Sequence, residues 1–203
     1  MGLAMVTGIG RTALVLLVTF IGSSCVVVED RGLSDGSHRL PSLESSLPRW
    51  TVNQALYEAM EPGAGSINIV LADQRLTLLD REGSTVIETD CSTGMVGKET
   101  PQGHFHILGK IQDKRSNRYG SYVSESTREI VEPRSWLVAR PPGTRFLGTS
   151  MPYWMRVTWA GVGIHVGGFQ RGQRTSMGCI RMPEGVQPLL FEKSAVGMRV
   201  RIE

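Results

Sequence analysis

The stretch GIHVGGFQRGQRTSMGCIR, residues 163–181, decides how this chain is interpreted. It places His165 fourteen residues before Cys179 and puts Gly178 directly before the cysteine. Glycine lets the backbone turn tightly, so that main-chain N–H groups can face a developing oxyanion. Histidine is the side chain best suited to accept a thiol proton near neutral pH. The stretch therefore predicts a cysteine nucleophile with a histidine base.

Both residues also have a simpler interpretation. Cys179 could be a buried structural thiol, and His165 could pack in the core of a strand over 162–166. In the catalytic interpretation the Cys179 thiolate attacks an amide carbonyl and forms a thioester. His165 then protonates the leaving amine and later deprotonates an acceptor amine. The backbone N–H groups of Gly178 and Cys179 would form the oxyanion hole.

Length and composition predict one mainly β domain with minor helices. The 203 residues suffice for one substantial core plus an extension, and 24 glycines with 10 prolines indicate many turns. Apolar residues at helical spacing predict a short helix over 50–60, ended by a Pro-Gly pair, and a second one over 184–194. Alternating or short apolar runs predict strands over 66–71, 75–79, 85–89, 104–107, 136–139, 155–159, 162–166 and 198–202.

The distribution of charge is more informative than its total of +3. Residues 133–182 contain no Asp or Glu but seven arginines. They form either a solvated basic face or a cleft for an anionic ligand, whose field would also lower the pKa of a nearby thiol. No nucleic-acid-binding motif accompanies them, so nucleic acid is not an expected partner. The arginines are Arg134, Arg140, Arg145, Arg156, Arg171, Arg174 and Arg181.

The N-terminus has the composition of an export signal. Arg11 precedes an apolar run over 12–21, which is too short to span a bilayer comfortably, and small residues follow at 22–24. Small residues directly before Cys25 resemble a bacterial lipobox, in which the cysteine becomes the lipidated first residue. Gly22 stands where that pattern usually has an aliphatic residue, and simple cleavage of the signal is the alternative.

These features predict an exported, periplasmic protein, anchored in the membrane through Cys25. Residues 1–24 would be the signal peptide of lipoprotein type. Residues 25–49 are rich in Ser, Pro, Gly, Asp and Arg without periodicity, and they predict a flexible tether. The sequence leaves open which membrane is the destination, and it leaves open the oligomeric state.

Cys91 and the pair His104 and His106 are weaker candidates for functional sites. Cys91 is expected to be a small buried residue in a strand, although a disulfide with Cys179 stays possible. His104 and His106 lie two residues apart and so share one face of a strand. No third ligand is near them in the sequence, and neither a metal nor a cofactor is expected.

Several motifs, taken in order, resemble the L,D-transpeptidase catalytic domain (the YkuD-like family). The strongest is the combination of residues 163–165 with SMGCIR at 176–181, in which Met177 stands where the family usually has a second histidine. The resemblance implies a mainly β fold, a β-sandwich of mixed sheets with minor short helices. The catalytic domain would cover 64–203, preceded by the short helix over 50–63. Weaker similarity lies in 67–69, 74–76, 92–94, 100–105 and 151–155.

The resemblance implies a peptidoglycan L,D-transpeptidase. Cys179 would form an acyl-enzyme with a tetrapeptide stem, release D-Ala, and pass the acyl group to an amine in a second stem or in a protein. Transfer to water would make it an L,D-carboxypeptidase instead. A non-catalytic peptidoglycan-binding lipoprotein is the alternative from another class, because Met177 departs from the motif.

The resemblance also implies roles for residues around the nucleophile. A backbone carbonyl just after the histidine, at Val166 or Gly167, would orient its ring. Arg181 would bind a substrate carboxylate through its planar fork, or alternatively form a structural ion pair. Ser176 would help to shape the turn at the substrate or else be an ordinary turn residue, and Tyr153 would line the cleft or else anchor the core.

Overall fold

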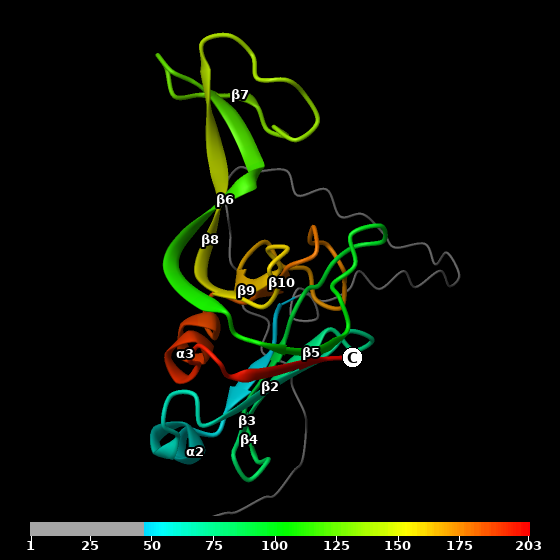
Figure 1. Ribbon diagram of the computed structural model, residues 1–203, viewed down its shortest axis with the longest axis vertical. Coiled ribbons are helices and arrows are strands. Elements are labelled where there is room, and N and C mark those ends of the chain that lie inside the picture. Colours follow the sequence, from blue (N-terminus) through cyan, green and yellow to red (C-terminus); the bar gives the residue numbers. More distant parts are fainter. Residues whose placement is uncertain (1–46) are drawn as a thin grey trace, which may run out of the picture. The chain divides into compact units, whose positions relative to one another are not determined.

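The computed structural model describes residues 47–203, and these form two mixed β-sheets with two short helices (Figure 1). The expected signal segment, the expected lipidation site at Cys25 and most of the expected tether lie outside the described residues. None of the helices within 47–203 has the length and apolar character needed to cross a bilayer.

The first sheet has six strands and carries much of the core. Neighbouring strands in it are β1 (Trp50–Val52), β4 (Thr85–Asp90), β3 (Arg75–Asp80), β2 (Gly65–Val70), β11 (Arg199–Ile202) and β5 (Gly103–His106). Strand β11 runs parallel to β2, and the other pairs are antiparallel. Side chains alternate across a sheet, so Ile67, Ile69, Leu76 and Leu78 are buried on one face.

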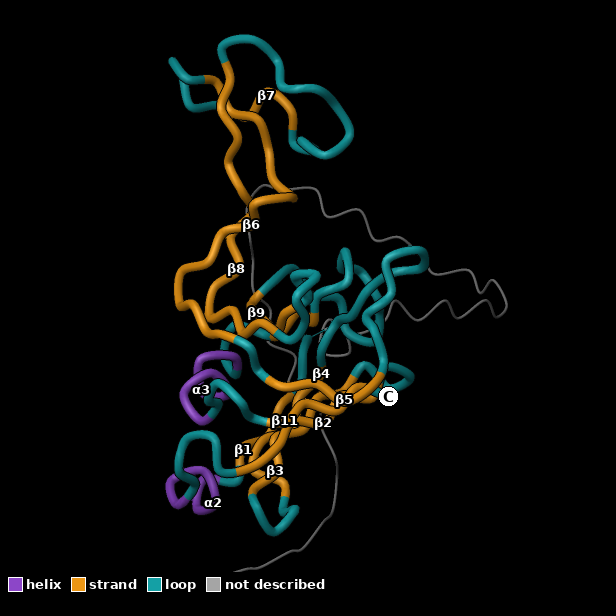
Figure 2. Tube along the Cα trace, in the orientation of Figure 1, coloured by secondary structure: helices purple, strands orange, loops and turns teal. Residues whose placement is uncertain are grey.

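The second sheet has five strands and carries the long hairpin. Its order is β10 (Ile180–Met182), β9 (Gly163–Val166), β8 (Thr144–Arg156), β6 (Gly109–Ser124) and β7 (Ile130–Glu132). Strands β10 and β9 are parallel. Strands β6 and β8 leave the sheet as an extended two-stranded arm, with β7 at its far end (Figures 1 and 2). The mainly β fold with two mixed sheets is therefore confirmed.

Both predicted helices are shorter than expected. In the first, the residues before 53 form β1 and pair with β4, and α2 covers only Gln54–Ala59. Asn53 ends the strand and caps the helix, because its side chain accepts a hydrogen bond from the Leu56 N–H at 3.3 Å. The second helix, α3 (Gln187–Lys193), tolerates a proline in its first turn, where no intrahelical N–H bond is lost.

The predicted strand over 136–139 is wrong. These residues form a loop between β7 and β8, and Trp136, Leu137 and Val138 are exposed rather than buried. Strands β6, β7 and β10 were not predicted, because β6 is rich in charged residues and the other two are only three residues long. Most of β8 was missed as well, since the predicted strand over 155–159 overlaps it only at residues 155–156. Apolar runs therefore located most strands of the core, except the short β10 with its buried Ile180 and Met182, but not those of the arm.

Candidate active site

Two neighbouring parallel strands bring the predicted catalytic residues together. His165 lies on β9 and pairs in register with Arg181 on β10, and Cys179 directly precedes β10. Strands in a sheet lie about 4.8 Å apart, so His165 and Arg181 are direct neighbours and Cys179 lies two residues before this pair. Both side chains line the same cavity, which has a volume of about 360 Å³.

The His165 ring is buried and held in one orientation. Its Nδ1 lies 2.7 Å from the Val166 carbonyl oxygen, which can only accept, so Nδ1 carries the proton and Nε2 keeps its lone pair. Burial lowers the pKa of His165 to about 4; the Val166 hydrogen bond opposes this shift and the Arg181 charge adds to it. The orienting carbonyl is that of Val166, the first of the two candidates from the sequence.

Burial also governs the Cys179 thiol. It raises the pKa of Cys179, while a backbone hydrogen bond from Gly163 and the charge of Arg181 lower it. The expectation that the basic surroundings would bring this pKa below its ordinary value is therefore wrong for this state, because desolvation outweighs them. Near neutral pH the resting site holds a thiol and a neutral imidazole.

The turn before Cys179 depends on a glycine and a serine. Gly178 has a φ of 111°, a conformation that L side chains rarely adopt. The buried Ser176 hydroxyl donates to the Cys179 carbonyl at 2.5 Å and accepts from the Gly178 N–H at 3.1 Å. The Gly178 N–H is thus already used, whereas no hydrogen bond within residues 47–203 uses the Cys179 N–H. The Cys179 N–H is the one available to an oxyanion in this conformation.

Residues 92–95 brace this turn from outside. Ser92 and Arg181 exchange two backbone hydrogen bonds, of 2.9 and 2.8 Å. The Ser176 N–H donates to the Thr93 carbonyl, and the Met95 N–H donates to the Ser176 carbonyl, both at 3.0 Å. The turn that carries Cys179 is therefore fixed on both sides by main-chain contacts.

Thr100 is a positioning residue that the sequence did not single out. Its buried hydroxyl accepts a hydrogen bond from the Gly94 N–H and donates one to the Gly178 carbonyl, both at 2.9 Å. In the sequence, Thr100 could have been identified only as the first residue of the motif at 100–105. That motif alone does not show that a hydroxyl bridges two distant backbone segments.

The Arg181 side chain packs beside Gly167 and lines the larger cavity. Its Nη1 lies 3.3 Å from the Gly168 carbonyl oxygen, and its side chain lines the larger cavity with Cys179. A Cβ on Gly167 would lie 2.9 Å from Arg181 Cγ and Cδ and 3.3 Å from His165 Cε1. Gly167 is therefore needed for space beside the two side chains rather than as the orienting carbonyl.

Tyr153 does not belong to this site. Its ring packs edge-to-face on Phe191 of α3, at a centroid separation of 5.5 Å, and it lines neither cavity that contains Cys179. The prediction that it contacts substrate is not supported by this placement. Met177, in contrast, lines both cavities beside Cys179. A thioether at this position gives the site an apolar wall instead of a polar donor.

A second, smaller cavity of about 150 Å³ opens at Cys179. Lys114, Arg118 and Arg156 line it, all from β6 and β8. Within the described part of the chain, neither cavity beside Cys179 is lined by an Asp or a Glu. The anionic-ligand alternative for the arginine-rich region is therefore favoured for Arg156 and Arg181, which lie next to the nucleophile.

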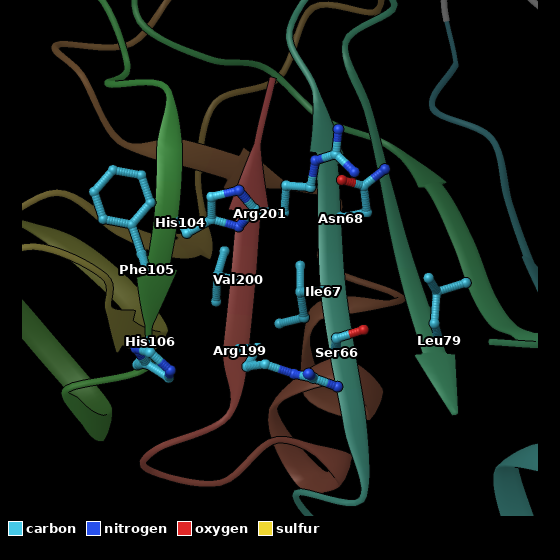
Figure 3. A pocket seen from close by; sticks show the side chains of 10 residues that line it. All are labelled: Ser66, Ile67, Asn68, Leu79, His104, Phe105, His106, Arg199, Val200 and Arg201. Carbon is cyan, nitrogen blue, oxygen red and sulfur yellow. The ribbon is translucent and has the colours of Figure 1, made fainter. Parts of the chain in front are cut away.

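The remaining candidates from the sequence lie elsewhere. Cys91 is a buried free thiol, and burial raises its pKa to about 12; it forms no disulfide with Cys179. His104 and His106 line a groove on the outer face of the first sheet, beside Arg199 and Arg201 of β11 (Figure 3). Within 47–203, no three His, Cys, Asp or Glu side chains are grouped so as to hold a metal ion.

We predict that Thr100→Val loosens the nucleophile turn. The substitution leaves the Gly94 N–H and the Gly178 carbonyl without their shared partner in a buried place, and each such loss costs about 1–3 kcal/mol. Denaturant unfolding should show this loss of stability. Thr100→Ser, which keeps the hydroxyl, should retain most of the stability; an equal loss in both variants would contradict this role.

Gly167→Ala should destabilise the protein, because its new methyl group would press on the Arg181 stem and the His165 ring. Overpacking of this kind costs about 1–3 kcal/mol. Gly168→Ala is the matched control, since its Cβ would meet only Arg181 Nη1, at 3.9 Å. The free energies of unfolding should therefore differ between the two variants. Equal values would show that Gly167 is not needed for space.

The buried His165 should make stability depend on pH in acid. Between its ordinary pKa of 6.5 and its folded value of about 4, the unfolded chain takes up a proton that the folded chain does not. Stability should therefore fall as pH falls through this window, by up to ~3 kcal/mol. His165→Asn should flatten the profile of unfolding free energy, while His104→Asn at an exposed site should not. A profile unchanged by His165→Asn would contradict the burial effect.

No curated protein sequence matches this chain. The L,D-transpeptidase from Mycobacterium smegmatis is 19% identical with a TM-score of 0.51, and the match covers 69% of this chain and 58% of that one. A cysteine-to-serine mutant of the Enterococcus faecium L,D-transpeptidase is 22% identical with a TM-score of 0.50, covering 76% and 66%. An L,D-transpeptidase in complex with imipenem is 20% identical with a TM-score of 0.51, covering 69% and 59%.

At these identities the structures establish a shared fold, and the chain spans less than two thirds of the length of the first of them. The sequence identifies the family as well as the fold. The sequence model of the L,D-transpeptidase catalytic domain family (YkuD) matches residues 64–202. That match includes both strands of the site and the turn between them. The chain therefore belongs to the L,D-transpeptidase catalytic domain family.

Proposed function

We propose that this protein is a peptidoglycan L,D-transpeptidase that works through a Cys179 acyl-enzyme. The observation that carries the proposal is the placement of Cys179 and His165 at one cavity by the pairing of β9 with β10. Family membership supports the reaction class. The substrates are peptide stems of peptidoglycan, whose carboxylates suit a site without acidic residues.

In the first half-reaction, the Cys179 proton passes to His165 Nε2 as Sγ attacks the carbonyl carbon before the terminal D-Ala. The negative charge that develops on the carbonyl oxygen is stabilised by the Cys179 N–H. Collapse of the tetrahedral intermediate breaks the C–N bond, and His165 gives its proton to the leaving amine. The products are free D-Ala and a thioester on Cys179.

In the second half-reaction, the amine of another stem attacks the thioester carbonyl. His165 takes the proton from this amine, the C–S bond breaks, and the proton returns to the Cys179 sulfur. The new amide is the cross-link or the attachment to a protein. Water in place of the amine gives a tripeptide, which is the L,D-carboxypeptidase outcome.

A neutral Cys179 thiol and a neutral His165 imidazole in the resting protein suit these two half-reactions. An ion pair between thiolate and imidazolium is disfavoured because burial opposes charge on both groups. Proton transfer therefore accompanies attack on the bound substrate instead of preceding it. The free thiol is then less exposed to oxidation in the periplasm, to which we assign the protein, anchored through a lipidated Cys25.

Incubation with defined tetrapeptide muropeptides, followed by mass spectrometry, tests the proposal. We expect dimers linked between the third residues of two stems, together with free D-Ala. Cys179→Ala should reduce D-Ala release by roughly 10⁴-fold or more. Cys91→Ala, at a thiol that lines neither cavity beside Cys179, should retain activity.

The products separate the alternatives. Tripeptides and D-Ala without dimers would assign the protein as a carboxypeptidase. Binding of the stems without any turnover, by a folded protein, would contradict an enzyme and favour the non-catalytic lipoprotein. A Cys179→Ala variant as active as the parent would contradict the proposed nucleophile.

A further inference from the structure

The smaller cavity beside Cys179 carries a group of cations that the reaction mechanism does not use. We call it the cationic cavity and define it by Lys114, Arg118 and Arg156 together with Trp154. Lys114 and Arg118 come from β6, and Arg156 and Trp154 come from β8. No Asp or Glu lines it among the described residues, so these three charges are not balanced within the cavity.

Arg156 contacts two tryptophan rings. Its guanidinium carbon lies 5.2 Å from the Trp154 ring centroid and 5.8 Å from that of Trp159. Its Nε is buried and has no hydrogen-bond partner within 47–203. The Trp154 indole N–H, also buried, has none either. Both donors are enclosed by protein, and Trp154 Nε1 packs against Gly163, so an anionic ligand is indicated by the three unbalanced cations that line the cavity rather than by these two atoms.

Lys114 adds a second positive charge to the same wall. Its Nζ donates to the Arg115 carbonyl at 2.8 Å and lies 5.8 Å from the Trp154 ring centroid. One hydrogen bond leaves the ammonium with two further donors. A planar carboxylate accepts on both oxygens and suits a guanidinium with an ammonium nearby.

The position of His165 decides which half of the substrate enters this cavity. His165 lines the larger cavity but not the cationic one. Because His165 must protonate the leaving amine, the leaving D-Ala lies on the larger-cavity side of Cys179. The acyl half of the donor stem therefore extends toward the cationic cavity.

We propose that the cationic cavity binds a free carboxylate on the acyl half of the donor stem, with Arg156 and Lys114 as specificity-determining residues. This inference rests on the proposed function. The carboxylate has two possible sources: the side chain of the third residue, when that residue is a diamino diacid, and the main-chain carboxylate of a second residue linked through its side chain. A third residue of lysine type would instead bring an uncompensated ammonium toward three cations.

Release of D-Ala from four synthetic tetrapeptide donors tests this. One donor carries both carboxylates, one is amidated at the third-residue side chain, one is amidated at the second residue, and one is amidated at both. The full-length protein should turn over the doubly amidated donor with a kcat/KM about 10- to 100-fold lower than the first, since a charged hydrogen-bonding partner is lost. Whichever single amidation reproduces this loss identifies the source.

Variants show whether the cations are responsible. Arg156→Gln and Lys114→Gln should lower kcat/KM for the free-carboxylate donor by about 10-fold or more and leave the doubly amidated donor nearly unchanged. Arg199→Gln, which replaces an exposed arginine of β11 that lines neither cavity beside Cys179, should leave both values unchanged. Arg156→Lys, which keeps the charge, should recover part of the loss and shows that a drop is not caused by misfolding.

The outcomes separate this inference from the proposed function. D-Ala released equally fast from all four donors, or an equal loss for all donors in Arg156→Gln, would overturn the carboxylate site while leaving the transpeptidase intact. Absence of D-Ala release from every donor, by a folded protein, would overturn the proposed function itself.

Discussion

The parallel pairing of β9 with β10 is the contact on which the rest of the site depends. It sets Arg181 in register with His165 and so places Cys179, at the start of β10, beside the strand of its base. Parallel pairing needs a crossover, and residues 167–179 supply it without a helix. The main-chain bonds of Ser92 and Thr93 and the Thr100 hydroxyl then hold the crossover's last turn in place.

Burial, more than charge, decides the chemistry of this site. A sequence rich in arginine near a cysteine suggests an activated thiolate, and Arg181 does lower the pKa of Cys179. The desolvation of both reacting groups is the larger effect, and it acts on them in opposite directions. The consequence is a resting pair that is uncharged and that becomes reactive only with substrate in the cavity. The basic side chains then act on the anionic substrate more than on the nucleophile.

Sequence patterns predicted those strands and turns that are determined by residues close together in the chain. Alternating apolar residues located the core strands, and the glycine before Cys179 indicated a turn that only glycine adopts readily. The arm was missed because β6 is stabilised by its pairing with β8 rather than by burial of an apolar face. The sequence could not decide whether Tyr153 lines the cleft or packs in the interior, and Thr100 and Arg156 were not singled out, because each depends on contacts between segments far apart in the chain. The resemblance to the family implied an orienting carbonyl at Val166 or Gly167, and the hydrogen bond of His165 is to Val166.

The central claim is a neutral thiol at Cys179, just before β10, and a neutral, buried imidazole at His165 on β9. It is tested most directly by the pH dependence of Cys179 alkylation. Iodoacetamide should be used on the Cys91→Ala protein, with rates measured between about pH 5 and pH 10. The raised pKa predicts a rate that climbs continuously with pH and is still rising above about pH 9. A rate that reaches a plateau near neutral pH would show a thiolate already formed in the resting protein, and would contradict this account.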